Sequence, residues 1–147
     1  MGNCGELYPQ PIAQCDGMKG GELIVVVTNN PLLKDEENVL FVEGTFKDVL
    51  VKVRDMVYSG NKLITHPLFA SSRLNFSPYR TVLVGDKPDC VSPEECQIVE
   101  DSIILYDNLT ARRRRQPEHD DDYADMDRRL YEAALEEVEV LVSSHVI

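Results

Sequence analysis

The sequence has no apolar run close to the roughly 20 residues that a membrane-spanning helix requires. Its N-terminus lacks the basic stretch and the apolar core of a secretory signal peptide. Basic residues are also few, since 15 lysines and arginines stand against 26 acidic residues and the net charge is −11. Such an acidic chain is repelled by phosphate backbones and anionic lipid. We therefore expect a cytoplasmic protein that binds neither nucleic acid nor membrane.

Cysteine is scarce and unevenly spaced. The four cysteines are Cys4, Cys15, Cys90 and Cys96. They are too few for the disulfide framework of a small secreted protein. Their spacing also matches none of the usual zinc-site patterns. We expect reduced thiols, no metal site and no cofactor.

Sequence motifs of catalysis are missing as well. The chain contains no glycine-rich dinucleotide fingerprint, no P-loop, no nucleophile elbow and no H-E-x-x-H pair. No second base, nucleophile or ligand set completes a catalytic group around any histidine. The sequence therefore provides no support for an enzyme.

The chain does contain the alternating pattern of an α/β domain. A continuous apolar run at residues 23–28 predicts a central strand that is covered on both faces. Helical periodicity follows at 45–59, 92–111 and 119–143. Further strands are predicted at 39–42, 62–65 and 81–84. We predict an α/β fold: a single domain whose short mixed or parallel sheet is flanked by helices, with a long C-terminal helix.

The helix at 45–59 has the clearest boundaries. Thr45 and Asp48 form a capping-box pattern, and Gly60 stands where a helix C′ glycine belongs. With strands before and after it, this helix predicts a parallel, right-handed crossover.

Composition divides the chain into three parts. Residues 1–21 form a flexible N-terminal tail rich in glycine and proline, and Met18 is an alternative start. Residues 22–111 form the α/β domain, and residues 112–147 form a charged linker and the C-terminal helix.

The C-terminal part combines strong charge with an apolar stripe. Arg112–Arg115 precede an acidic block that includes Asp120–Asp122. We interpret the two runs as solvated charges that compensate each other and the helix dipoles, with nucleic-acid contact or a divalent ion as alternatives. The stripe of Leu130, Ala134, Val138 and Leu141 is either core or the interface of a homodimer.

The candidate site is the long polar connection at residues 66–80, because irregular connections of this length are usually functional or disordered. Ligands of open α/β sheets bind beyond the carboxyl ends of the strands, where the turn after residue 28 also lies. His66 has the pKa range for acid–base work, although a His-Pro pair can also simply end a strand. The candidate ligand-binding residues are Thr28, Asn29, Asn30, Thr65, His66, Arg73, Asn75, Tyr79 and Arg80.

Several segments of the sequence follow the pattern of one known family. They are Val27–Leu32, Phe41–Asp55, Leu63–Leu68, then Ser71, Asn75 and Pro78-Tyr79, and finally 82–84 and 98–103. This chain resembles the GrdX family over roughly residues 22–110, whereas the helix from His119 onward lies outside the likeness. Phe69-Ala70, Leu74 and Phe76 depart from the family pattern and make the loop more apolar.

The resemblance implies a small protein of anaerobic bacteria that is encoded beside selenium-dependent glycine, sarcosine and betaine reductases. It implies a non-catalytic accessory role, with reductase components as partners. The competing hypothesis is a small-molecule binder or enzyme in which the 66–80 loop holds an anion or an amino-acid-derived ligand.

Overall fold

Three short strands form the mixed sheet at the centre of the computed structural model, which describes residues 24–86, 90–112 and 117–145. The strand order is β2-β1-β3, so β1 (Ile24–Thr28) is central, as predicted. It pairs in parallel with β2 (Val39–Phe41) and antiparallel with β3 (Thr81–Gly85). The predicted α/β fold with a mixed sheet is therefore confirmed.

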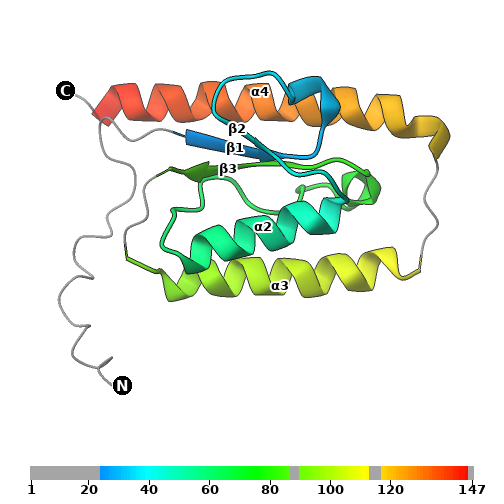
Figure 1. Cartoon of the computed structure of the whole chain (residues 1–147), viewed down its shortest axis with the longest axis horizontal. Helices are drawn as coiled ribbons and strands as arrows, with labels where there is room; N and C mark the ends of the chain where they lie inside the picture. The colour runs from blue at the N-terminus through cyan, green and yellow to red at the C-terminus, as the bar shows by residue number, and fades with distance from the viewer. Residues whose placement is uncertain (1–23, 87–89, 113–116, 146–147) are drawn as a thin grey trace.

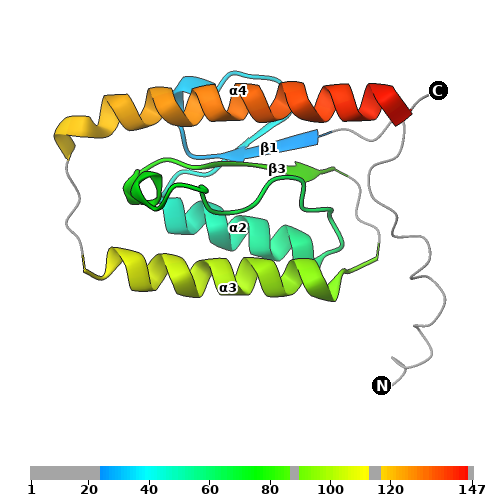
Figure 2. The same cartoon turned by 180° about the vertical axis from the view of Figure 1, so that it is seen from behind.

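Helices cover both faces of this sheet (Figures 1 and 2). On one face lie α2 (Phe46–Tyr58) and α3 (Pro93–Thr110), and on the other lies α4 (Asp120–His145). Successive residues of a strand point to opposite faces. Val27 accordingly joins the cluster under α2 and α3, while Val26 joins the cluster under α4. The double covering explains why β1 is apolar at every position before Thr28.

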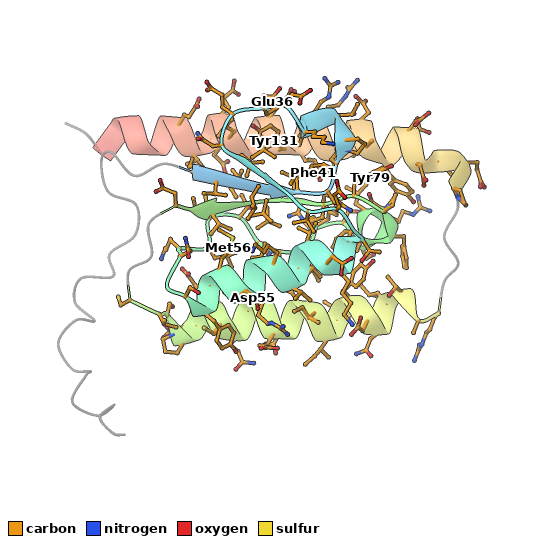
Figure 3. The ribbon with its side chains drawn as sticks, viewed as in Figure 1. Glu36, Phe41, Asp55, Met56, Tyr79 and Tyr131 are labelled. Carbon is orange, nitrogen blue, oxygen red and sulfur yellow. The ribbon has the colours of Figure 1, made fainter. Side chains whose placement is uncertain are left out.

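The apolar stripe of α4 belongs to the core. Tyr131 is 7% exposed and packs between α4 and the sheet with Ala134 and Val138 (Figure 3). Leu130 lies at the margin of this contact and is 39% exposed. The side chain of Leu141 lies outside the described part.

The predicted caps of α2 are present. Thr45 accepts a hydrogen bond from the Asp48 amide, and the Asp48 carboxylate accepts one from the Thr45 amide at 2.8 Å. Gly60 follows the helix at φ 101°, in the left-handed region that favours glycine. The Ser92 cap of α3 is confirmed in the same way, since its side chain accepts from the Glu95 amide.

The prediction of a strand at 62–65 is wrong. The segment runs beside β3, but only Leu63 forms an antiparallel bridge, with Val84. The ladder stops because the carbonyl of Leu83 accepts from both Ile64 and Thr65, while the Leu83 amide donates to the Thr65 hydroxyl. The segment still runs parallel to β2, as a crossover requires, but at the opposite edge of the sheet.

Some expectations concern residues beyond the described ranges or need correction. The predicted tail at 1–21 and Arg113–Arg115 lie outside the described residues. The expectation of reduced thiols holds for Cys96 but is wrong for Cys90, which is disulfide-bonded. No helix in the described ranges is long and apolar enough to span a membrane.

We predict that Leu50→Ala strongly destabilises the fold. Leu50 is fully buried in the cluster between α2, α3 and the sheet, so truncation leaves a cavity and should lower the free energy of unfolding by about 2–5 kcal/mol. The exposed Lys52, two residues away on α2, supplies the control. Lys52→Ala should change stability by less than about 0.5 kcal/mol in the same urea titration. Equal effects would contradict this packing.

Candidate functional site

The end of β1 meets the start of β3 because these two strands are antiparallel. Thr28 faces Thr81 across the ladder, and their hydroxyl oxygens are 2.8 Å apart. The turn after β1 therefore lies against the last residues of the 66–80 loop. This brings the predicted residues Asn29 and Asn30 close to Arg80.

Asn29 ties three segments together. Its Nδ2 donates to the carbonyls of Gly44 and Pro78, both at 2.9 Å. Its Oδ1 accepts from the Arg80 amide, also at 2.9 Å. The side chain is 6% exposed, and both of its polar atoms bind the protein's own backbone.

Asp127 of α4 is the buried acid of this region. It is 1% exposed, and its Oδ1 accepts from the Thr81 amide at 3.0 Å. Its Oδ2 accepts from the Thr81 hydroxyl at 2.6 Å and from Asn30 Nδ2 at 3.0 Å. Asn30 also donates to the carbonyl of Ala124. Both oxygens of this buried carboxylate therefore have hydrogen-bond donors.

Arg80 supplies the opposing charge and closes the loop. Its Nη1 lies 4.0 Å from Asp127 Oδ1, while Nε and Nη2 each donate at 2.7 Å to the carbonyls of Pro67 and His66. Its guanidinium lies 4.1 Å from the centre of the Phe69 ring. Burial lowers the pKa of Arg80 to about 10, and Asp127 opposes this shift. The side chain is therefore still charged at neutral pH.

The rest of the loop is also held by its own side chains. Asn75 accepts from the amide of Phe69 and donates to the carbonyl of the same residue, at 2.9 and 3.2 Å. The His66 ring is exposed, and its Nδ1 accepts from the Leu68 amide at 3.0 Å. Arg73 is exposed on the 3-10 turn at 72–76.

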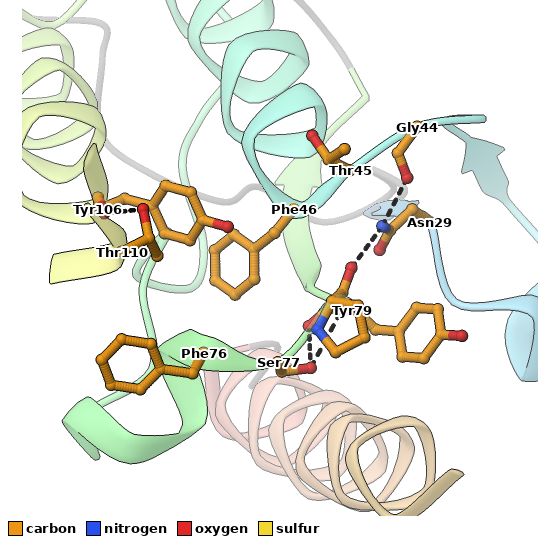
Figure 4. A pocket seen from close by; sticks show the side chains of 10 residues that line it. Asn29, Gly44, Thr45, Phe46, Phe76, Ser77, Tyr79, Tyr106 and Thr110 are labelled. Carbon is orange, nitrogen blue, oxygen red and sulfur yellow. Dashed lines mark hydrogen bonds between the residues drawn. The ribbon is translucent and has the colours of Figure 1, made fainter. Parts of the chain in front are cut away.

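Two cavities flank the loop. A smaller one of about 180 Å³ is lined by Thr65, His66 and Arg80 together with residues of α4. A larger one of about 400 Å³ is lined by Asn29 and Tyr79 together with residues of α2 and α3 (Figure 4). Thr28, Asn30, Arg73 and Asn75 line neither of these two cavities. The predicted residues are therefore neighbours, but they do not converge on one cleft, and their role in binding stays a prediction.

The comparison with known proteins identifies the family of this chain. A family model for GrdX-like proteins matches residues 25–136. The chain belongs to the GrdX-like family. No curated protein and no solved structure matches it.

The GrdX-like match extends beyond the likeness seen in the sequence, which ended near residue 110. It includes α4 as far as residue 136 and hence Asp127, which we had not chosen as a site residue. Asp127 was hidden in an acidic block that we interpreted as solvated. Asp127 stands four residues before the buried Tyr131 and three residues after the buried Ala124, which places it on the inner face of α4. That periodicity was the available signal.

The acidic run at the start of α4 includes side chains that form surface ion pairs. No group of three or more histidine, cysteine or acidic side chains with metal-binding geometry occurs among residues 24–86, 90–112 and 117–145. Asp125 instead forms surface pairs with Arg128 and Arg129, both at 2.8 Å.

We predict that Asp127→Ala destabilises this GrdX-like protein by about 3–5 kcal/mol, because it leaves Arg80 buried without its counter-charge and Thr81 and Asn30 without their acceptor. Asp125→Ala, two residues earlier on the same helix, removes only surface pairs and should leave the unfolding midpoint unchanged. Urea denaturation of both variants measures the difference. A mild effect at Asp127 would show that α4 is not anchored through this carboxylate.

Proposed function

We propose that this chain is a non-catalytic accessory protein of a selenium-dependent glycine, sarcosine or betaine reductase system. In this proposal it acts in the cytoplasm of an anaerobic bacterium through contacts with reductase components. Membership of the GrdX-like family supports the setting, because the resemblance implies genes that lie beside those of the reductases.

One observation carries the mode of action: the polar side chains at the strand ends bind their own chain. Asn29, Asn30 and Asp127 use their polar atoms for hydrogen bonds that join strands, loop and α4. A general acid, base or nucleophile needs a polar atom within reach of the substrate. The arrangement supports a rigid scaffold for a partner more than it supports turnover.

The competing proposal, an anion held by the loop, has less support. Arg80 is 7% exposed and donates to the carbonyls of Pro67 and His66, so its guanidinium serves the loop itself. Arg73 is exposed, and a lone surface guanidinium binds small anions weakly.

The surface best suited to a protein partner lies where the loop meets α4. His66 and Ala70 are exposed there and line the smaller cavity together with Leu130 of α4. Met126, one turn before Leu130, is 42% exposed. We call these four residues the loop–α4 face. Exposed methionine and a lack of charged side chains are typical of the centre of a protein interface.

We predict that a tagged chain recovers reductase components from a glycine-fermenting anaerobe, and that the double variant His66→Ala/Leu130→Asp recovers at least about tenfold less. The substitutions remove a hydrogen-bonding group and place a charge in the apolar centre of the loop–α4 face. Ile104→Asp is the matched control, because Ile104 is 58% exposed on α3, on the opposite side of the sheet. Mass spectrometry with isotope-labelled peptides measures the recovery.

The recoveries can be compared only if the double variant and its control are both folded, so we require equal melting temperatures for the two. Recovery of no reductase component by the wild-type chain would refute the partner assignment. Equal recovery by all three chains would refute the loop–α4 face while leaving the reductase setting intact.

A homodimer through α4 is a second proposal, supported by the exposure of Met126 and Leu130 on this helix. We expect sedimentation velocity over a concentration series to show a dimer that Leu130→Asp converts to monomer. A wild-type chain that stays monomeric at every concentration would refute the dimer. The loop–α4 face would then remain available for a reductase component.

A further inference from the structure

The larger cavity lies away from the loop–α4 face, on the α2–α3 side of the sheet. It opens between the start of α2, the end of α3 and residues 76–79 (Figure 4). Its volume is about 400 Å³. Small-molecule sites occupy roughly 300–1,000 Å³, and a cavity of about 150 Å³ suffices for benzene. The space is therefore adequate for a molecule of one or two rings.

Aromatic rings form the cavity wall. The rings of Phe46 and Tyr106 are stacked, with centroids 4.6 Å apart and planes inclined by 19°. The Phe76 ring lies across the opening from this pair, whereas the Tyr79 ring points away from it (Figure 4). Stacked and edge-on contacts between aromatic rings each contribute about 0.5–1.5 kcal/mol beyond simple burial.

The polar groups of the wall are already bonded within the chain. Ser77 donates to the carbonyl of Tyr79, and Thr110 donates to the carbonyl of Tyr106 at 2.8 Å. The amide of Asn29 binds Gly44 and Pro78. Lysine, arginine, histidine and acidic side chains are all absent from the described lining. The wall therefore offers a ligand ring surfaces but no counter-charge.

The hydroxyl of Tyr106 is the exception among these polar groups. It forms no hydrogen bond to any described residue. Burial, aided by Asp107, raises the pKa of Tyr106, so the phenol stays protonated and can donate at neutral pH.

We propose that this cavity binds a small, uncharged aromatic molecule. The ligand ring lies against Tyr106 and Phe76, and a polar substituent accepts a hydrogen bond from the Tyr106 hydroxyl. Phe46 is 1% exposed and supports the Tyr106 ring from behind. An anionic ligand would lose its hydration here without gaining an opposite charge, which makes its transfer unfavourable. This inference is independent of the proposed reductase setting.

Indole is a suitable probe because the chain contains no tryptophan, so no tryptophan emission overlaps that of indole. We expect the full chain to bind indole saturably, with a blue shift and increased anisotropy of its emission. Nuclear magnetic resonance on the same wild-type chain should show amide shifts centred on Thr45, Ser77 and Thr110. This measurement needs no variant.

Thr110→Phe tests the site by filling the cavity. It places a ring at the end of α3 and should weaken indole binding by at least about tenfold. Ile104→Phe adds the same ring to the exposed side of the same helix and should leave binding unchanged. Tyr106→Phe keeps the stack but removes the hydroxyl, and should weaken binding about fivefold. Melting temperatures report whether each variant is folded.

Four results would overturn the proposal. They are no saturable binding by the wild-type chain, amide shifts centred elsewhere, unchanged affinity in a folded Thr110→Phe variant, and equal loss in the Ile104→Phe control. Displacement of bound indole by phenol, tetramethylammonium and benzoate tests whether the ligand is uncharged. If either ion displaces indole at a lower concentration than phenol does, the site does not prefer an uncharged ligand.

Discussion

The position of α4 on the sheet depends on the hydrogen bonds of the Asp127 carboxylate. It comes from α4 and reaches the first residue of β3 and the turn after β1, so one side chain joins three elements far apart in sequence. Removing a charge from water is costly unless hydrogen bonds and an opposite charge replace the lost hydration. Thr81, Asn30 and Arg80 supply these groups. Apolar packing alone would let α4 slide along the sheet, whereas these directional bonds define one register.

Arg80 transmits this constraint to the loop. Its guanidinium lies between Asp127 and the backbone of residues 66–68, so the charge that balances α4 also determines where the loop folds back. Asn29 and Asn75 complete the frame from the two sides. The polar groups that made the loop look like a binding site are largely those that give it a single conformation.

The ordered loop separates two surfaces of different chemistry. Its first half, near His66, lies beside α4 on one side of the sheet, and its second half, near Phe76, lines the aromatic cavity beside α2 and α3. A ligand on one side and a protein on the other would therefore contact the same rigid segment. The contacts of Arg80 with Asp127 and with the carbonyls of residues 66 and 67 hold this segment in place.

Local patterns in the sequence were sufficient for much of the fold. The apolar run of β1, the capping box at Thr45, the glycine at residue 60 and the Ser92 cap each act over a few residues, so they could be recognised without the tertiary structure. The segment at 62–65 has the composition of a strand, yet the Thr65 hydroxyl takes the amide that a regular ladder would use. Whether Asn29 and Arg80 bind a ligand or the protein itself depends on which groups folding brings within 3 Å. The sequence by itself determined the three main helices, three of the four predicted strands and their order. Only the tertiary structure decided the role of Asp127, because its hydrogen bonds join residues that are separated by 46 and by 97 positions in the chain and therefore leave no local periodic pattern.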